Sequence, residues 1–544
     1  MSESRRVLRS VPAHLEQRYV SEGWWTDATL GGRVAEWLAA APDAAIHIHS
    51  RTREWHGTYA DIDTEARRLV SFLRGEGIAA GAVVAFQIPN WREAVATFCG
   101  LAMGGYILVP ITHIYGRKEV SFILDECSAE AYISPAAYGH VDYAEIIDHA
   151  APNSLRLHLV VGEGADRPVP AGVRRASWAE VKACDPAAEL TEPSASDIAV
   201  LAYTSGTTSD PKGAIHNHHT LLSELEHMAM WLTDRRPNLM GSPVAHATGM
   251  LGGVLGPLYV GGDIHLTDRW DPGHALEVML AHDIGGGVGA SIFLTSLLDH
   301  PDFTPEHAAL MPRVGQGGAP VPAALGQRAE SLGIKIIRAY GSTEHPSVTG
   351  MAYEEPAELR HNTDGRPRPG VEMRIVDESG RDLPAGNPGE IVTRGPELCL
   401  GYTDPELNTA FDEDGWYRTG DIGIVDEHGC LTITDRVKDI IIRGGENLSA
   451  AEIEAVIGKI TGVAEVAVVA APDERLGEHA CAVIRLLPDA DPIDLPALAP
   501  HLEQAGLARQ KWPEELRLVT DFPRTASGKI RKVDLRSQLR EGDL

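Results

Sequence analysis

The fold can be inferred from one stretch of the sequence, Tyr203-Thr204-Ser205-Gly206-Thr207-Thr208-Ser209-Asp210-Pro211-Lys212-Gly213. An apolar run at residues 198–203 precedes it and predicts a buried strand. Gly206 permits a tight turn without a Cβ clash, and backbone N–H groups, hydroxyls and Lys212 can bind an anionic phosphate chain. The stretch ends in Pro-Lys-Gly, whereas a Walker loop ends in Gly-Lys-Ser or Gly-Lys-Thr, so this is a different kind of phosphate loop. A polar turn between strand and helix is the alternative. We expect a loop that binds ATP through Thr204, Ser205, Gly206, Thr207, Thr208 and Lys212.

The stretch resembles the phosphate loop of the adenylate-forming superfamily, which includes acyl-CoA synthetases, luciferases and adenylation domains of peptide synthetases. The superfamily usually has glycine where this sequence has Ser209. A Cβ there stiffens the loop, so we expect slower or differently positioned closure with function retained. The resemblance covers nearly the whole sequence, because all the core motifs occur in order between residues 203 and 532.

Composition limits the class of protein. With 544 residues, the chain is long enough for two or more domains. A net charge of −29 argues against a nucleic-acid partner or an anionic-membrane surface. The six cysteines are scattered without metal spacing, which favours reduced thiols in a cytoplasmic enzyme. We expect no signal peptide and no integral membrane segment, since the apolar run 249–262 is too short and glycine-rich to span a bilayer.

Helical and strand patterns alternate in the first part of the chain. The expected helices include residues 30–38 and 62–73, and the expected strands are 83–88, 106–109, 131–133 and 155–161. Such alternation predicts an α/β fold of layered, mostly parallel sheets covered by helices. Four prolines make residues 168–193 loop-like.

The end of the chain predicts a smaller α+β unit. Its expected helices are 451–457 and 495–503, and its expected strands are 465–470, 481–486 and 516–519. The resemblance implies a large domain at residues 1–437, with a small β-barrel-like subdomain, and a small mobile domain at 438–544 that pivots at Lys438. A homodimer is possible.

Two glycine-containing motifs predict the adenosine site. They are Gly315-Gln316-Gly317-Gly318-Ala319-Pro320 and Arg338-Ala339-Tyr340-Gly341-Ser342-Thr343-Glu344. Tyr340 can stack on adenine, Thr343 can bond a phosphoryl oxygen, and Glu344 is a hard oxygen ligand for Mg²⁺. The expected nucleotide contacts are Gly317, Gly318, Ala319, Ala339, Tyr340 and Gly341, and the expected metal ligands are Thr204 and Glu344.

Two further segments are expected to line the acyl pocket. In Pro243-Val244-Ala245-His246-Ala247-Thr248-Gly249, the resemblance places His246 in the passage between carboxylate and thiol. This motif has no Asp to pair a substrate ammonium, so an amino-acid substrate is disfavoured. The resemblance implies that residues 284–291 form a strand at one wall of the acyl pocket, and their glycines fit either a widened pocket or a tightly packed inner strand. The expected pocket residues are His246, Val288, Ser291 and Gly315.

The remaining motifs lie toward the end of the chain. Asp421 can accept both ribose hydroxyls. The resemblance implies that Arg436 meets the nucleotide, that Lys438 is the hinge, and that Arg443, Gly444 and Gly445 contact coenzyme A. Ser527-Gly528-Lys529 matches the superfamily's mobile lysine, which bridges carboxylate and α-phosphate, although basic tails are often merely solvated.

We therefore expect an ATP-dependent acyl-CoA synthetase that uses ATP, Mg²⁺ and coenzyme A. The pocket segments carry no Arg or Lys for a second carboxylate, so we expect a medium-chain, alicyclic or aryl monocarboxylate. A long-chain fatty acid, an enzyme that loads a carrier protein, and a luciferase-like oxygenase remain alternatives. A non-catalytic nucleotide sensor would be expected to lack Lys529 or Glu344, and both are present.

Overall fold

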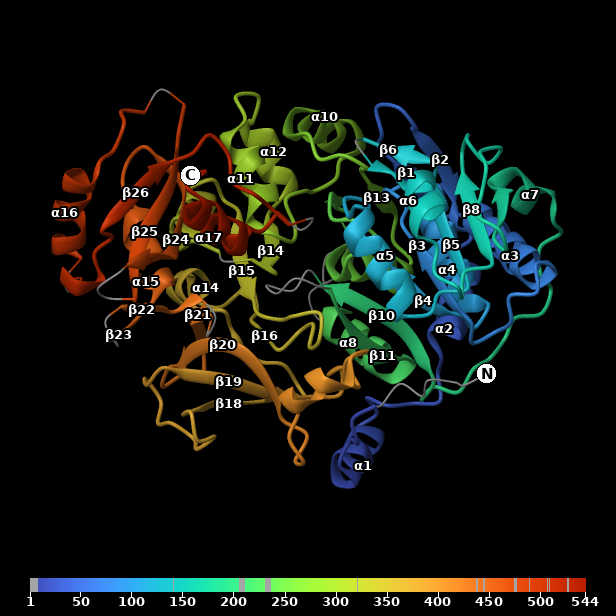
Figure 1. The fold of residues 1–544 in the computed structure, drawn as a ribbon, viewed down its shortest axis with the longest axis horizontal. Helices are drawn as coiled ribbons and strands as arrows, with labels where there is room; N and C mark the ends of the chain where they lie inside the picture. Colours follow the sequence, from blue (N-terminus) through green and yellow to red (C-terminus); the bar gives the residue numbers. More distant parts are fainter. Residues whose placement is uncertain are drawn as a thin grey trace.

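The structure is a computed structural model. It describes residues 8–544 except 140, 205–210, 230–235, 320, 437–438, 444–445, 474–476, 489, 506, 508 and 526–527. Figure 1 shows a large domain and a smaller C-terminal domain that lies beside helices α11 and α12. Among the described residues no helix is both long and apolar enough to cross a membrane.

A seven-stranded sheet forms the centre of the first part of the chain. Its order is β11 (Lys212–Asn217), β10 (Ile198–Thr204), β4 (Ile107–Pro110), β3 (Val83–Phe86), β5 (Ala131–Pro135), β8 (Leu157–Val161) and β9 (Arg174–Ser177). Every neighbouring pair is parallel except β10 with β11. The expected strands at residues 83–88, 106–109, 131–133, 155–161 and 198–203 are confirmed within a few residues.

Helices cover both faces of this sheet, because side chains of a strand alternate between its faces. Val84 and Phe86 pack with α2 (Leu30–Ala40), α3 (Tyr59–Gly75) and α4 (Arg92–Met103). Val83 and Ala85 pack on the opposite side with α5 (Arg117–Glu126) and α6 (Tyr143–Ala150). A capping box between Thr58 and Asp61 begins α3.

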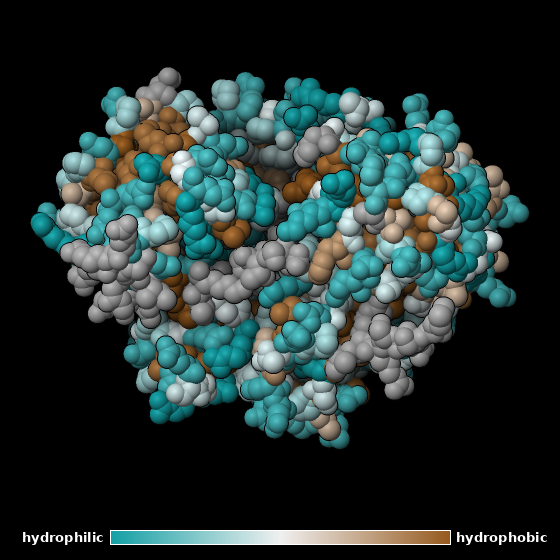
Figure 2. Space-filling view, viewed as in Figure 1, coloured by the Kyte–Doolittle hydropathy of each residue, from teal (hydrophilic) through white to brown (hydrophobic). Residues whose placement is uncertain are grey.

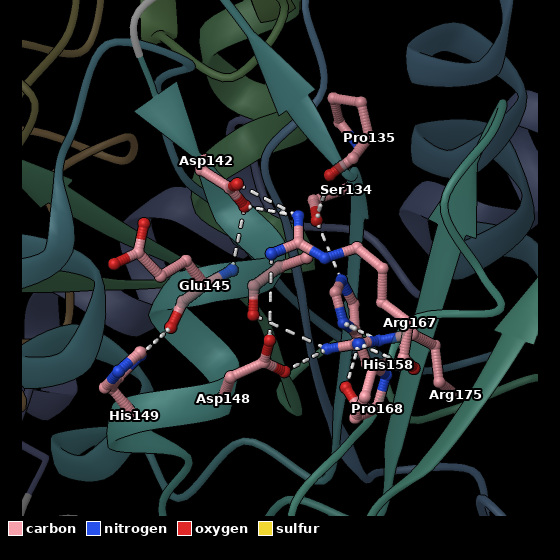
Figure 3. Close-up of polar contacts among 11 residues, drawn as sticks. Ser134, Pro135, Asp142, Glu145, Asp148, His149, His158, Arg167, Pro168 and Arg175 are labelled. Atoms are coloured by element: carbon pink, nitrogen blue, oxygen red, sulfur yellow. Dashed lines mark hydrogen bonds and ion pairs between the residues drawn. The ribbon is translucent and has the colours of Figure 1, made fainter.

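The expectation that residues 168–193 form only loop is wrong. The segment contains the edge strand β9 and helix α7 (Trp178–Ala183). Arg175 of β9 donates to Nδ1 of His158 at 3.2 Å and to Asp148 at 2.7 Å, and Arg167 pairs with both oxygens of Asp142 (Figure 3). Only Ala176 of β9 is buried, so the strand has almost no apolar alternation that could have predicted it.

A second sheet has the order β12 (Leu239–Met240), β13 (Ile264–Leu266), β1 (Ala45–Ile48) and β2 (Trp55–Thr58). Helix α10 (Pro272–His282) follows β13. A parallel pair, β14 (Arg313–Gly317) and β15 (Lys335–Ala339), packs with α11 (Ser291–Asp299), α12 (Pro305–Leu310) and α13 (Ala323–Ser331).

The expected barrel-like subdomain is a four-stranded antiparallel sheet. Its order is β18 (Glu372–Val376), β19 (Gly389–Arg394), β20 (Tyr417–Val425) and β21 (Leu431–Arg436). Within the described residues β18 and β21 form its two edges and do not pair with each other.

The C-terminal domain is an α+β unit, as expected. Its sheet contains β23 (Glu446–Leu448), β22 (Ile441–Arg443), β25 (Gly477–Leu486), β24 (Val463–Asp473) and β26 (Glu515–Leu518). Helices α15 (Ala450–Ile457) and α16 (Leu495–Gln504) cover one face. Helix α17 (Lys532–Glu541), which the sequence analysis did not predict, covers the other through Leu535.

The remaining elements are short or connect the sheets. They are α1 (Ala13–Ser21), β6 (Ala137–Tyr138), β7 (Val141–Asp142), α8 (His218–Ala229), a π-helix at Gly249–Leu255, α9 (Gly256–Val260), β16 (Thr349–Gly350), α14 (Ala357–Asn362), β17 (Arg366–Pro367) and 3₁₀ turns at Pro405–Ala410 and Arg509–Lys511. The face in Figure 2 is mainly hydrophilic and is hollowed between the C-terminal domain and the part of the large domain that carries β1 to β5.

Candidate active site

Thr204 and Lys212 anchor the two ends of the predicted phosphate loop. They lie opposite each other in the antiparallel β10–β11 ladder, so the loop connects two strands rather than a strand and a helix. A neighbouring segment fixes β11: Ile215 N–H donates to Gly401 O at 2.9 Å, and Thr403 N–H donates to Gly213 O at 2.8 Å. Ser205, Gly206, Thr207, Thr208 and Ser209 lie outside the described residues.

Glu344 lies close to the same hairpin. The hydroxyl of Tyr402 donates to Glu344 Oε1 at 2.8 Å and lies 3.1 Å from the hydroxyl of Tyr417. Nζ of Lys212 is 5.8 Å from the centroid of the Tyr402 ring. A carboxylate and a lysine from distant parts of the sequence therefore face one region. Thr343 is held there by its backbone, because its carbonyl accepts from His216 Nε2 at 2.8 Å.

The two glycine-containing motifs meet at the carboxyl ends of parallel strands, where ligands bind in open α/β sheets. Gly317 at the end of β14 is paired with Ala339 at the end of β15. Gly318 has φ +73°, and Ala319 follows it. A Cβ on Gly341 would lie 1.6 Å from the carbonyl oxygen of Pro346, so only glycine fits there. The expected adenosine residues are thus brought together.

Tyr340 and Asp421 form a buried pair beside these strands. The phenolic O–H of Tyr340 donates to Asp421 Oδ2 at 2.7 Å. Burial, together with the charge of Asp421, raises the pKa of Tyr340 well above its usual value. Arg436 lies opposite Asp421 in the β20–β21 register, and its side chain is outside the described part of the chain.

The expected strand at residues 284–291 is wrong. The segment forms only isolated bridges, one of them between Gly289 and Gln316, and Ser291 begins helix α11. The glycines explain the difference, because Gly287 and Gly289 have positive φ values of 75° and 105°. Val288 packs partly against the core of β14 and α11, and the segment does lie beside Gly315, whose carbonyl accepts from Gly289 N–H.

His246 and the segment 284–291 lie on the same side of the molecule as Lys529. A Cβ on Gly289 would contact Thr248 Cγ2 at 3.2 Å, which places the His246 motif against this wall. Burial, and then the charge of Lys529, lowers the pKa of His246 to about 4, so the imidazole is neutral at pH 7. A Cβ on Gly528 would lie 2.6 Å from Ile292 of α11, which shows that the Lys529 turn touches the large domain.

The Lys529 turn is held by its own domain. Thr525 N–H donates to Lys529 O at 2.8 Å, and Lys529 N–H donates to Thr525 Oγ1 at 3.1 Å. Arg524 donates to Glu465 of β24 at 2.7 Å. The backbone of Lys529 is therefore fixed to the small sheet, and its position depends on how this domain is oriented.

The expected coenzyme A residues are only partly described. Arg443 ends β22, and its guanidinium makes a bidentate pair with Glu514 at 2.8 and 3.0 Å. Gly444, Gly445 and the expected hinge Lys438 lie outside the described residues. Directly after Lys438, Asp439 accepts from Arg536 of α17 at 2.7 Å.

Sequence reasoning missed residues whose positions depend on long-range contacts. Tyr402 contacts Glu344 and Tyr417, and no local motif marks it; Tyr417 lies four residues before the predicted Asp421 but was given no role. A fully buried network also lies behind the site, where Glu397 pairs with His345 at 3.1 Å and with His227 at 3.4 Å. His345 directly follows the predicted Glu344, which is the one local signal for this network.

Comparisons with known proteins match this arrangement. The sequence profile of the AMP-binding enzyme matches residues 34–403, and that of the AMP-binding enzyme C-terminal domain matches residues 452–529. The chain is 31% identical over 532 residues to the medium-chain fatty-acid–CoA ligase of Escherichia coli (strain K12), covering 96% of this chain and 93% of that protein. It is 30% identical to the 2-hydroxy-7-methoxy-5-methyl-1-naphthoate–CoA ligase of Streptomyces carzinostaticus, covering 97% of this chain and 96% of that protein.

The fold agrees with these sequence matches. ATP-bound MatB from Rhodopseudomonas palustris superposes with a TM-score of 0.83 at 26% identity, covering 95% of this chain and 99% of that chain. The resemblance inferred from the phosphate loop is thus confirmed. The chain belongs to the AMP-binding enzyme family of adenylate-forming proteins.

Proposed function

We propose that this protein is an ATP-dependent acyl-CoA synthetase that joins a monocarboxylate to coenzyme A in two half-reactions. The observation that carries the proposal is the approach of the Lys529 turn to α11 and His246. Glu344 and Lys212, which both lie beside Tyr402, would act on the phosphate chain of ATP. This arrangement suits the first half-reaction, in which two anions must be brought together.

In the first half-reaction a carboxylate oxygen attacks the α-phosphorus of ATP. A new P–O bond forms, the bond from the α-phosphorus to the bridging oxygen breaks, and pyrophosphate leaves with its electron pair. Lys529 would bridge the carboxylate and the α-phosphate, and Lys212 would offset charge on the phosphate chain. Neutral His246 would line the path without adding a further charge.

The residues present fit Mg²⁺. The carboxylate of Glu344 and the hydroxyl of Thr204 are oxygen donors, which this hard cation prefers. When bound, Mg²⁺ would supply positive charge that offsets the negative charge of the phosphate chain. Tyr402 would orient Glu344 for this role, since its hydroxyl donates to Oε1.

In the second half-reaction the coenzyme A thiolate attacks the acyl carbon, and AMP leaves as the C–O bond breaks. Lys529 must then withdraw, so we propose that residues 438–544 rotate about Lys438 relative to residues 1–437. The proposed boundary at Lys438 falls between the two family profiles, since the first match ends at residue 403 and the second begins at residue 452. Arg443, Gly444 and Gly445 would contact coenzyme A. The ion pair of Arg443 with Glu514 would then open or shift.

A medium-chain, alicyclic or aryl monocarboxylate is the proposed acid. Residues 244–250, 285–295 and 345–350 contain no Arg or Lys that could pair a second carboxylate. The names of two relatives, a medium-chain fatty-acid–CoA ligase and a naphthoate–CoA ligase, support the same range.

The test supplies the purified protein with ATP, Mg²⁺, coenzyme A and a panel of acids. We expect acyl-CoA, AMP and pyrophosphate in equal amounts, with medium-chain, alicyclic or aryl acids preferred over dicarboxylates and long-chain fatty acids. Acyl-AMP without thioester, followed by transfer only when a carrier protein is added, would identify a carrier-loading enzyme and contradict the proposal.

A further inference from the structure

Five histidines lie together on one face of the second sheet. His47 belongs to β1 and His49 directly follows that strand, His56 belongs to β2, His265 to β13, and His282 ends α10. None of them belongs to the site described above. Figure 1 shows β1, β2 and β13 side by side in the large domain, with α10 near them.

Strand register explains the gathering. His47 is the Cα partner of His265 in the parallel β1–β13 pair and of His56 in the antiparallel β1–β2 pair. Residues opposite each other on paired strands point to the same face. His49 shares that face because it lies two positions after His47.

The other face of these strands belongs to the hydrophobic core. Ile46 and Ile48 of β1, with Ile264 and Leu266 of β13, are fully buried in it. The alternation Ile-His-Ile-His at residues 46–49 and Ile-His-Leu at 264–266 therefore separates an apolar face from a face of imidazoles.

The imidazole nitrogens are close to one another. Nδ1 of His47 is 2.7 Å from Nδ1 of His56, and Nε2 of His49 is 3.0 Å from Nδ1 of His265. One ring nitrogen each from His47, His265 and His282 lies within 4.8 Å of the others. Burial and the neighbouring rings lower the pKa of His49 and His265 to about 3, so both rings are neutral and keep a lone pair.

We propose that this histidine face binds one divalent transition-metal ion such as Zn²⁺, through His47, His265 and His282, with His49 or His56 as a fourth ligand. Imidazole favours zinc, nickel and copper over Mg²⁺, so this site is chemically distinct from an oxygen-ligand site. Two nitrogens bound at about 2.1 Å to one ion are at most about 4.2 Å apart. The ring nitrogens lie within 4.8 Å of one another, and rotation of the exposed His282 side chain would bring its nitrogen within this shorter distance of the other two.

Such an ion would join β1, β13 and the end of α10, which are otherwise linked through the sheet and the chain. His56 already pairs with Glu54 at 3.1 Å, and Asp263 accepts from Ala45 N–H at 2.8 Å beside the cluster. Both carboxylates would partly balance the charge of a bound cation.

The test is calorimetric titration of Zn²⁺ into the full-length protein, produced without a polyhistidine tag and treated with EDTA. We expect one equivalent to bind in the presence of excess Mg²⁺. His282→Ala and His47→Gln should each weaken binding at least tenfold. His428→Ala, which removes an exposed histidine from a turn of the antiparallel sheet, should leave binding unchanged.

His282 is exposed at a helix end, so His282→Ala should fold, and circular dichroism of all variants verifies this. Absence of stoichiometric Zn²⁺ binding would overturn the proposal. Binding that persists unchanged in folded His282→Ala and His47→Gln would overturn it equally, because the ion would then lie elsewhere.

Discussion

The hydroxyl of Tyr340 donates a 2.7 Å hydrogen bond to the carboxylate of Asp421. This contact connects the loop after β15 to β20 of the antiparallel sheet, and both side chains are nearly excluded from water. The pair therefore fixes the position of the carboxylate that is predicted to hold the ribose.

Tyr340→Phe should raise KM for ATP by roughly tenfold with a smaller effect on kcat, because loss of a hydrogen bond to a charged group costs about 1.5–3 kcal/mol. Initial rates at varied ATP measure this. Tyr138→Phe is the control, since its hydroxyl bonds Asp268 O at 3.1 Å away from the site. An unchanged KM for ATP in Tyr340→Phe would show that Asp421 does not need this donor.

Lys529→Ala should reduce acyl-AMP formation by roughly two to three orders of magnitude, because a charge at the reacting oxygen, where we propose that Lys529 acts, is worth on the order of 3–4 kcal/mol. Thioester formation from pre-made acyl-AMP should largely survive. Lys532→Ala is the matched control, since Lys532 pairs with Glu454 at 2.8 Å within the small domain. Equal loss of both half-reactions in Lys529→Ala would mean that this lysine is structural.

Glu344→Gln should abolish most ATP turnover while the fold persists, because the substitution keeps the shape but removes the charge that we propose holds Mg²⁺. Pyrophosphate release measures turnover, and circular dichroism checks the fold. Glu354→Gln, which changes an exposed carboxylate paired with Arg313, is the control. Near-normal pyrophosphate release would contradict the assignment of Glu344 as metal ligand.

Lys438→Pro should allow one burst of acyl-AMP but little thioester. Proline fixes φ near −65° and removes a backbone donor, so the small domain should remain with Lys529 in the site. Lys438→Ala should be far milder, because the backbone can still rotate. Pyrophosphate and acyl-CoA are measured in parallel. Thioester formation by Lys438→Pro at the wild-type rate would exclude this residue as the pivot.

Glu224→Gln should stabilise the protein increasingly as pH rises from about 5 to 8. Burial raises the pKa of Glu224 to about 8, above an unfolded value of about 4.3. The folded state therefore binds more protons than the unfolded state within this window. Stability falls with rising pH by up to about 1.4 kcal/mol per unit.

Glutamine is neutral throughout and removes that slope. Melting temperatures of wild type and Glu224→Gln across this range provide the measurement, and Glu226→Gln, two residues away and exposed, provides the control. A variant less stable than wild type at pH 8 would indicate that Glu224 is ionised in the folded protein.

Local patterns predicted much of the fold and the order of the site motifs. Val83 to Phe86 is apolar because both of its faces are covered, and the glycines at 317, 318 and 341 lie where strands end. Patterns fail where the signal is not local. Strand β9 buries one residue and is held by Arg175, and residues 284–291 bridge β14 without becoming a strand.

A motif that contains its own chemistry allows a site residue to be proposed from sequence, as with Glu344 and Lys529, whose roles stay predictions. Tyr402 could not be found this way, because its contact with Glu344 spans 58 positions. The histidine face was hidden for the same reason. The Ile-His alternation marks one strand, but only register with β2 and β13 shows that the imidazoles of three strands meet.

Thr204 and Lys212 pair across the β10–β11 ladder, so the two ends of the phosphate loop are held independently of the length of the loop. The backbone positions of both residues are set by the strand pairing, in which the residues between them take no part. Doubling the length of a flexible loop raises the free-energy cost of closing it by only about 0.6 kcal/mol. Segments from other adenylate-forming enzymes could thus be grafted between these two residues without refolding the domain, which makes the loop an exchangeable part for tuning turnover.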